Sequence, residues 1–340
     1  MSRKDGLIRT TRREFLMLGA AGLTMPLMPR LAFAQEVALP PAAEAFGATV
    51  KAMGPAPTPI RLAMLSFQGS SFWEAVDQGI AAATPYLKEL NTTVDNIQLG
   101  TGLTAEVIIA GIDGALAKQY QGIATIPIFD GTVAKVNEAV AGGVPFIAFI
   151  ADSAEKSNRT VGMGQLAYDA GKSGGEFIVK QLGGKGKIAV ITGYLGAAQH
   201  DARMNGALDF LKKEHPDIAI VGPFECKDDD ATAYSQATNA MTSNPDLAII
   251  YVTAGGSEAA AKAVRDAGMT GKVGVVGYDD LPEKQQYKDG GEILALIDQA
   301  PARQSFDSLV MLHNIIGFGA KYPSDVAVAA PIAFGKLAKS

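Results

Sequence analysis

The sequence has very little of what disulfide frameworks, metal sites and nucleic-acid surfaces require. It contains one cysteine, Cys226, and three histidines, His200, His215 and His313. A single cysteine cannot form a disulfide within the chain, and histidines without His-x-x-His spacing or cysteine partners do not support a zinc or haem site. Acidic residues outnumber basic ones by 35 to 30, so the charge gives no reason to expect nucleic acid as a partner. We therefore predict no metal ion and no other cofactor.

The chain also lacks a long apolar run, and residues 1–34 have the pattern of an export signal. A basic stretch precedes a short apolar stretch that Pro26 and Pro29 interrupt, whereas a membrane span would need about 20 apolar residues. The pair Arg12-Arg13 before Glu14-Phe15-Leu16 resembles the twin-arginine signal, which implies the twin-arginine translocase as a partner during export. A general secretion signal is the alternative. In both cases we expect cleavage after Ala34 and a mature protein in the periplasm.

Two kinds of segment follow the signal. Residues 35–59 combine five prolines with small residues, and we predict a flexible leader there. From Ile60 onward, runs rich in Val and Ile alternate with helical stretches; the runs cover residues 60–67, 122–129, 145–151, 187–192, 218–224, 247–253 and 273–279. Such alternation is typical of parallel sheets covered by helices on both faces. Because there are too many units for one small sheet, we predict an α/β fold of two doubly wound, Rossmann-like lobes.

Polar and aromatic residues gather where the predicted strands end. In open parallel sheets, ligands bind beyond the carboxyl ends of the strands. Aromatic faces together with Arg, Asp and Gln suit a ring that carries hydroxyls, because each hydroxyl both donates and accepts a hydrogen bond. The sequence therefore predicts a carbohydrate or polyol ligand. The candidate ligand-binding residues are Ser70, Phe72, Trp73, Asp130, Asp152, Arg203, Asp228, Gly256, Asp279 and Gln299.

The order of several segments resembles a known family. They read LSFQGSSFWEAVDQGI, GGVPFIAFIAD, LGAAQHDARMNGALDFL, NPDLAIIYVTAGGSEAAAKAV, VGVVGYDD and ILALIDQAPARQSF. Together they resemble the type I periplasmic sugar-binding proteins, the ribose-binding-like receptors of ABC importers, over nearly all of residues 60–335. The resemblance implies two lobes joined by three crossovers, which we place near residues 153–159, 299–301 and 324–328. The N-terminal lobe would then comprise 60–155 plus 300–325, and the C-terminal lobe 156–299 plus 326–340.

The resemblance also implies roles for single residues. Phe72 and Trp73 match the paired aromatics that stack on the sugar ring, and Arg203 matches the arginine that holds ring and hydroxyl oxygens. Asp279 matches a hydroxyl-accepting aspartate, and Gln299 a glutamine of the hinge that also touches the ligand.

Several positions depart from the family pattern. Ser70 and Gly256 stand where the family often has Asn, and Asp228 replaces a frequent aromatic. Ile150 and Ala151 stand where an Asp-Arg pair often ends the fourth strand, with Asp152 one step later. These departures argue against ribose itself. Another sugar, a deoxy sugar, a polyol and a non-sugar small molecule stay open.

Each site residue also has a structural alternative. The two rings could belong to the core, and Arg203 could pair with Asp201 at the surface. Asp279 could cap a helix, and Gln299 could be a linker amide. The run of three aspartates from Asp228 is typical of a solvated loop and lacks the order of a calcium loop.

Two other classes of protein compete with a binding protein. The first is an exported enzyme, a hydrolase or a cofactor enzyme, that acts on a small carbohydrate-like substrate; paired strand-end carboxylates leave it open. The second is a sugar-responsive transcription regulator, but the export signal occupies the place of its DNA-binding segment. We predict a monomeric binding protein that is not an enzyme, closes on its ligand and delivers it to an ABC permease, with a chemoreceptor as another partner.

Overall fold

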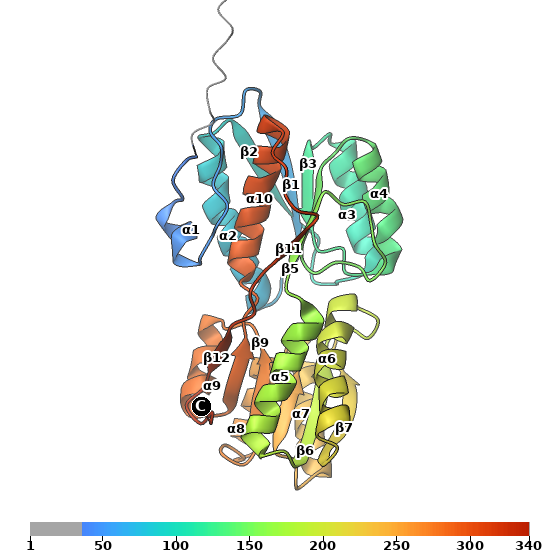
Figure 1. Cartoon of the computed structure of the whole chain (residues 1–340), viewed down its shortest axis with the longest axis vertical. Helices are drawn as coiled ribbons and strands as arrows, with labels where there is room; N and C mark the ends of the chain where they lie inside the picture. Colours follow the sequence, from blue (N-terminus) through green and yellow to red (C-terminus); the bar gives the residue numbers. More distant parts are fainter. Residues whose placement is uncertain (1–35, 340) are drawn as a thin grey trace, which may run out of the picture. The chain divides into compact units, whose positions relative to one another are not determined.

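The computed structural model describes residues 36–339, which form two six-stranded sheets with their helices (Figure 1). The expected export signal and its cleavage site lie outside the described residues. Within the described part, no helix is long and apolar enough to cross a membrane.

The first sheet has the strand order β11-β5-β4-β3-β1-β2, and its pairings are all parallel. Its strands are β1 (Ile60–Ser66), β2 (Thr92–Gln98), β3 (Gly122–Thr125), β4 (Phe146–Ile150), β5 (Val161–Gly164) and β11 (Asp325–Ala327). Its helices are α1 (Pro41–Ala45), α2 (Ser71–Lys88), α3 (Ala105–Ala117), the short η1 (Asp130–Thr132), α4 (Val133–Ala141) and α10 (Pro301–Phe318). Figure 1 shows α2 and α10 on one side of this sheet and α3 and α4 on the other. Strand β4 is therefore apolar and buried throughout, whereas the edge strand β2 alternates with exposed residues.

The second sheet has the order β12-β10-β9-β8-β6-β7, and only the pairing of β12 with β10 is antiparallel among the described pairs. Its strands are β6 (Gly186–Thr192), β7 (Ile218–Glu225), β8 (Ile249–Val252), β9 (Gly274–Tyr278), β10 (Ile293–Ile297) and β12 (Ile332–Phe334). Its helices are α5 (Ala167–Leu182), α6 (Ala198–Glu214), α7 (Asp230–Ser243), α8 (Ser257–Asp266), the short η2 (Pro282–Lys284) and α9 (Gln285–Gly290). Ile188 and Val190 belong to one apolar cluster and Ala189 and Ile191 to another. Because successive strand residues point to opposite faces, the two clusters cover the two faces of this sheet.

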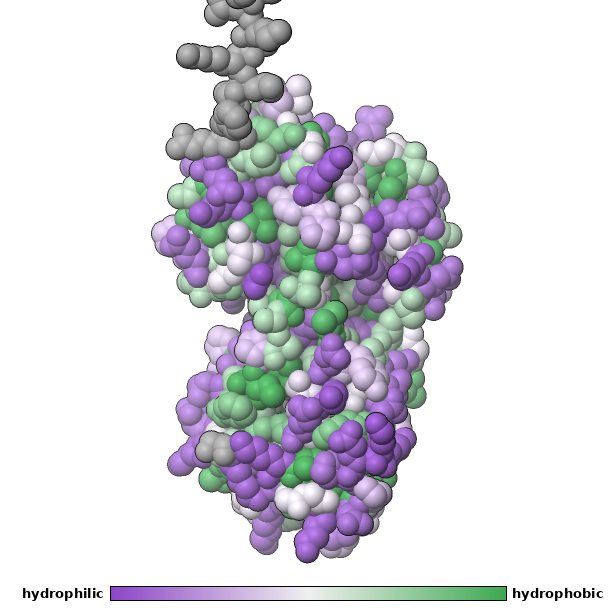
Figure 2. Space-filling model, in the orientation of Figure 1, coloured by the Kyte–Doolittle hydropathy of each residue, from purple (hydrophilic) through white to green (hydrophobic). Residues whose placement is uncertain are grey.

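These two sheets confirm the predicted fold class of two doubly wound α/β lobes. Large apolar side chains are scarce on the surface of the described chain; the exposed ones include Leu166, Leu195 and Phe334. Figure 2 shows a mainly hydrophilic surface with scattered apolar residues on the visible face.

The predicted lobe boundaries need correction. We expected residues 156–299 and 326–340 in the C-terminal lobe, but β5 pairs with β4 and β11 pairs with β5 in the first sheet. The chain thus leaves the first lobe after Gly164, not near residues 153–159, and it enters β12 only after β11. Strand β5 reads VGMG. Two glycines among four residues conceal a strand from a search for Val- and Ile-rich runs.

The prediction of a flexible leader is wrong for residues 36–59, which we call the N-terminal strap. Ala43 and Ala52 of the strap are fully buried. The backbone N–H groups of Thr49 and Val50 each donate to Asp307 Oδ1 at 3.0 Å. Prolines remove backbone donors, but they do not prevent the remaining donors from bonding to buried side chains of α10.

Candidate functional site

Residues from both lobes line one cavity of about 740 Å³, counting space that opens to solvent. Within this space the centre of a water-sized sphere can occupy about 80 Å³, so the two walls lie close together. Eight of the ten predicted site residues lie in its wall: Ser70, Phe72, Trp73, Arg203, Asp228, Gly256, Asp279 and Gln299. The fold thus brings strand-end residues from distant parts of the chain together.

The aromatic part of the wall lies at the start of α2. Gly69 has φ +99°, a conformation that favours glycine, and it turns the chain from β1 towards the helix. The rings of Phe72 and Trp73 meet edge to face, with centroids 5.1 Å apart, and Trp73 also contacts the buried Phe67. Both rings are half-buried against the apolar cluster of the first lobe. They therefore contact the core and line the cavity at the same time.

Arg203 of α6 is the most unusual residue of the wall, because its side chain is 1% exposed and has no carboxylate partner among its described hydrogen bonds. Its Nη2 donates to Gln299 Oε1 at 2.6 Å and to Gln165 Oε1 at 3.1 Å. The guanidinium lies 4.0 Å from the ring centre of Tyr278, a favourable cation–π arrangement. Surface pairing with Asp201 is thereby ruled out. Its Nε is buried without an acceptor in the protein, which leaves a costly unused donor.

Gln299 connects Arg203 to the carboxylate of Asp279, which follows the neighbouring strand β9. Its Nε2 donates to Asp279 Oδ1 at 2.6 Å, while its Oε1 accepts from Arg203. Asp279 follows β9 with φ +65°, which turns its side chain out of the strand direction. The amide and the carboxylate thus orient each other, and both border the cavity. Gln304 Nε2 donates to the backbone oxygen of Gln299 at 2.7 Å and fixes this crossover to α10.

Asp228 and Gly256 belong to neighbouring loops. The backbone N–H of Gly255 donates to Asp228 Oδ1 at 2.9 Å. Gly256 has φ +96°, and a Cβ there would lie 2.5 Å from Cβ of Ala233. Glycine is therefore required at this position, and backbone rather than a side chain borders the cavity. Burial raises the pKa of the nearby Cys226 thiol to about 12, so this cysteine is a poor nucleophile at neutral pH.

Six polar residues of the wall were not among the predicted site residues: Ser71, Gln199, His200, Asp230, Glu258 and Lys284. His200 lies three residues before Arg203 on α6, so helical spacing could have indicated it. The backbone N–H of Tyr194 donates to its Nδ1 at 3.0 Å, and burial lowers its pKa, so the ring is neutral. Burial raises the pKa of Glu258 and of Asp230. Nothing in the sequence pattern indicated Lys284, which reaches the wall from η2.

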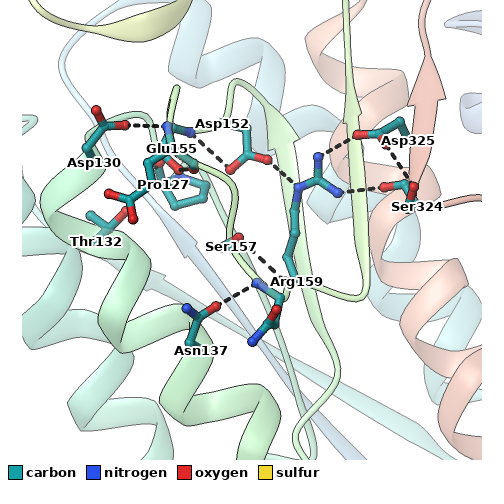
Figure 3. Close-up of polar contacts among 12 residues, drawn as sticks. Pro127, Asp130, Thr132, Asn137, Asp152, Glu155, Ser157, Arg159, Ser324 and Asp325 are labelled. Carbon is teal, nitrogen blue, oxygen red and sulfur yellow. Dashed lines mark hydrogen bonds and ion pairs between the residues drawn. The ribbon is translucent and has the colours of Figure 1, made fainter.

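Asp130 and Asp152 are not among the residues that line the cavity. Figure 3 shows the contacts that they make instead. Asp130 Oδ1 accepts the backbone N–H of Glu155 at 2.8 Å. Asp152 forms an ion pair with Arg159, whose Nη2 also donates to Asp325 Oδ1 at 2.6 Å. Arg159 therefore draws Asp152 towards β11, at the edge of the first sheet, and both aspartates stabilise the loop that follows β4.

A family model described as a periplasmic binding protein domain matches residues 63–321 of this chain. The chain belongs to the periplasmic binding protein family. It is 30% identical to the D-allose-binding periplasmic protein of Escherichia coli over 220 residues, which cover 62% of this chain and 70% of the relative. It is 24% identical to a D-ribose/D-allose-binding protein of Pseudomonas aeruginosa over 248 residues, 68% of this chain and 72% of the relative. The crystal structure of GanP, a glucose-galactose binding protein from Geobacillus stearothermophilus, matches the fold with a TM-score of 0.74 at 24% identity, covering 81% of this chain and 97% of GanP.

The cavity of this periplasmic binding protein combines hydrogen-bonding groups with aromatic surface. Its wall offers a guanidinium, carboxylates and amides as hydrogen-bonding groups, beside two aromatic rings. Within residues 36–339, no three His, Cys, Asp or Glu side chains form a group that could hold a metal ion. Membership of the family implies a periplasmic location, and the curated relatives named above are binding proteins.

Proposed function

We propose that this chain binds a neutral sugar or polyol in the cavity between its lobes and delivers it to the permease of an ABC importer. The observation that carries this proposal is the buried guanidinium of Arg203 with its unused Nε donor, in the same cavity as the rings of Phe72 and Trp73. A ring with hydroxyls can accept from such a donor while its C–H face covers an aromatic ring.

The charges of the wall favour a neutral ligand. Four carboxyl side chains line the cavity, those of Asp228, Asp230, Glu258 and Asp279, against the two cations Arg203 and Lys284. The Nζ of Lys284 also donates to the backbone oxygen of Tyr278 at 2.9 Å, which fixes its position. A phosphorylated ligand would meet more carboxyl groups than cations in this wall, which counts against it.

Contacts between the lobes support capture by closure. Gln199 of α6 donates to the backbone oxygen of Ile150 at 2.7 Å, so a side chain of the second lobe bonds to the first. The rings of Phe129 and Tyr194, one from each lobe, meet edge to face with centroids 6.2 Å apart. A ligand that contacts both walls binds this arrangement better than an open one and shifts the population towards it.

Sequence relatives support the ligand class and the cellular role. Proteins named for D-allose and for D-ribose match most of this chain. We extend this to export by the twin-arginine translocase, cleavage after Ala34, function as a monomer that is not an enzyme, and docking of the closed form on a permease or a chemoreceptor.

Calorimetry with refolded protein tests the proposal. The protein is unfolded, washed free of retained ligand, refolded, and titrated with pentoses, hexoses, deoxy sugars, polyols and inositols. We expect saturable binding of at least one compound with no change in the compound itself. At 100 times its Kd, this ligand should raise the free energy of unfolding by about 2.7 kcal/mol. If no compound of the panel binds, the proposal is refuted. If the protein converts a sugar into a product, the exported enzyme is favoured.

A further inference from the structure

The two walls of the cavity differ in chemistry. Every charged residue of the lining lies in the second lobe. The first lobe supplies an aliphatic wall, which we define as Leu103, Ile126, Ile128, Ile150 and Ala151. Beside this wall, the only polar side-chain atoms that the first lobe's lining residues carry are the hydroxyls of Ser70 and Ser71 and the indole nitrogen of Trp73.

Several polar groups close to the aliphatic wall are already bonded within the protein. The N–H of Ile150 donates to Gln304 Oε1 at 2.9 Å, and its oxygen accepts from Gln199. The N–H of Ala151 donates to the oxygen of Phe149 at 2.8 Å. The hydroxyl of the neighbouring Thr125 donates to the oxygen of Leu65 at 2.9 Å. A ligand hydroxyl against this wall would therefore lose water without gaining these groups as partners.

We propose that the ligand is a deoxy sugar whose methyl or methylene group lies against the aliphatic wall, an inference that rests on the proposed function. An unpaired hydroxyl at this place should weaken binding about tenfold to a hundredfold. A buried methyl or methylene group should instead strengthen binding about fourfold. The hydroxyls that remain face Ser70, Ser71 and the polar wall of the second lobe.

Matched pairs of sugars test this inference by calorimetry on the refolded protein. The pairs are 6-deoxy-D-allose with D-allose, L-fucose with L-galactose, L-rhamnose with L-mannose, and 2-deoxy-D-ribose with D-ribose. We expect the tightest ligand of this set to be a deoxy sugar that binds at least about tenfold more tightly than its parent. If every parent that binds does so as tightly as its deoxy partner, the inference is overturned and the proposed function stands. If no sugar or polyol binds, both are overturned.

A variant locates the preference in the aliphatic wall. Ile128 is 2% exposed, and Ile128→Thr replaces the ethyl branch by a hydroxyl, so the preference for the deoxy sugar should fall at least about threefold. Ile97→Thr is the matched control, because Ile97 lies on the edge strand β2 outside the cavity wall; it should leave the preference unchanged. An unchanged preference in folded Ile128→Thr protein would overturn the inference. Should this variant fail to fold, the wild-type pairs still decide the question.

Discussion

Replacement of Arg203 by lysine is the sharpest test of the cavity as a binding site. Lysine keeps the positive charge but replaces a planar group with five donors by one ammonium. In the structure, the two bonds of Nη2 orient Gln299 and Gln165, and Nε is the donor left for a ligand. Arg203→Lys therefore removes the fixed directions of these donors without removing the charge.

The expected loss follows from the bonds that disappear. A hydrogen bond to a charged group contributes about 1.5–3 kcal/mol. If one bond between Arg203 and the ligand is lost, Kd should rise about tenfold to 150-fold. For a micromolar ligand, with a total binding free energy of about −8 kcal/mol, this is about a fifth to two fifths of the whole.

Calorimetry with the sugar found in the panel measures this loss, with thermal unfolding as a check of folding. Arg265→Lys is the matched control, because Arg265 lies on α8, pairs with Glu292 at 2.8 Å and is outside the cavity wall. The control should bind like wild type. A folded Arg203→Lys protein whose Kd lies within twofold of wild type would refute the reasoning and remove Arg203 from the binding site.

Three further predictions concern the rest of the chain. Asp307→Ala removes the buried carboxylate that accepts the backbone donors of Thr49 and Val50, so urea denaturation should show a loss of about 2–5 kcal/mol; an unchanged stability would mean that the strap is not held by α10. Burial lowers the pKa of His313, so the unfolded chain binds the proton first and the contribution of this histidine to stability should fall as the pH drops below about 6.5, by up to about 1.4 kcal/mol per pH unit; the buried His200 adds a contribution of the same sign. His313→Gln should flatten this slope between pH 6.5 and 5, whereas an equally steep slope in that variant, or the same flattening in a His215→Gln control, would contradict the assignment. Because burial raises the pKa of Cys226 to about 12, iodoacetamide at pH 7.5 should modify it only after unfolding, and rapid modification of native protein would show that it is accessible.

The rule that parallel strands end at a common edge predicted much of the site. It placed Asp228, Gly256 and Asp279 together, because β7, β8 and β9 run in the same direction in one sheet. The same rule failed for Asp152, although Asp152 also follows a central strand. There a neighbouring cation, Arg159, competes for the carboxylate and holds it at the sheet edge. The apolar runs show where the central strands lie along the chain. Which polar partner a side chain chooses depends on neighbours that only the tertiary structure brings close.

The strap shows a signal that composition conceals. Its prolines resemble those of a flexible linker, yet α10 carries Asp307, His313 and Asn314, all buried. Buried polar side chains on an apolar helix require partners. The strap provides them, since Met53 N–H donates to Asn314 Oδ1 at 2.9 Å and Gly54 oxygen lies 2.9 Å from His313 Nε2. The polar residues of α10 therefore indicate that the strap is ordered, whereas the strap's own sequence suggests a flexible linker.

Helix α10 links the strap to the cavity, because some of its polar side chains bond to residues of the cavity wall and others bond to the strap. Gln304, in its first turn, bonds to both Gln299 and Ile150, which border the cavity from different lobes. One turn later Asp307 binds the strap, and His313 and Asn314 continue this contact. In the closure proposed above, the lobes turn about crossovers such as the one at Gln299 while α10 stays fixed in the first lobe. The strap stabilises the helix against which that crossover would move. This gives a physical reason for an ordered segment ahead of the first strand, although the candidate site lies at the other end of the sheet.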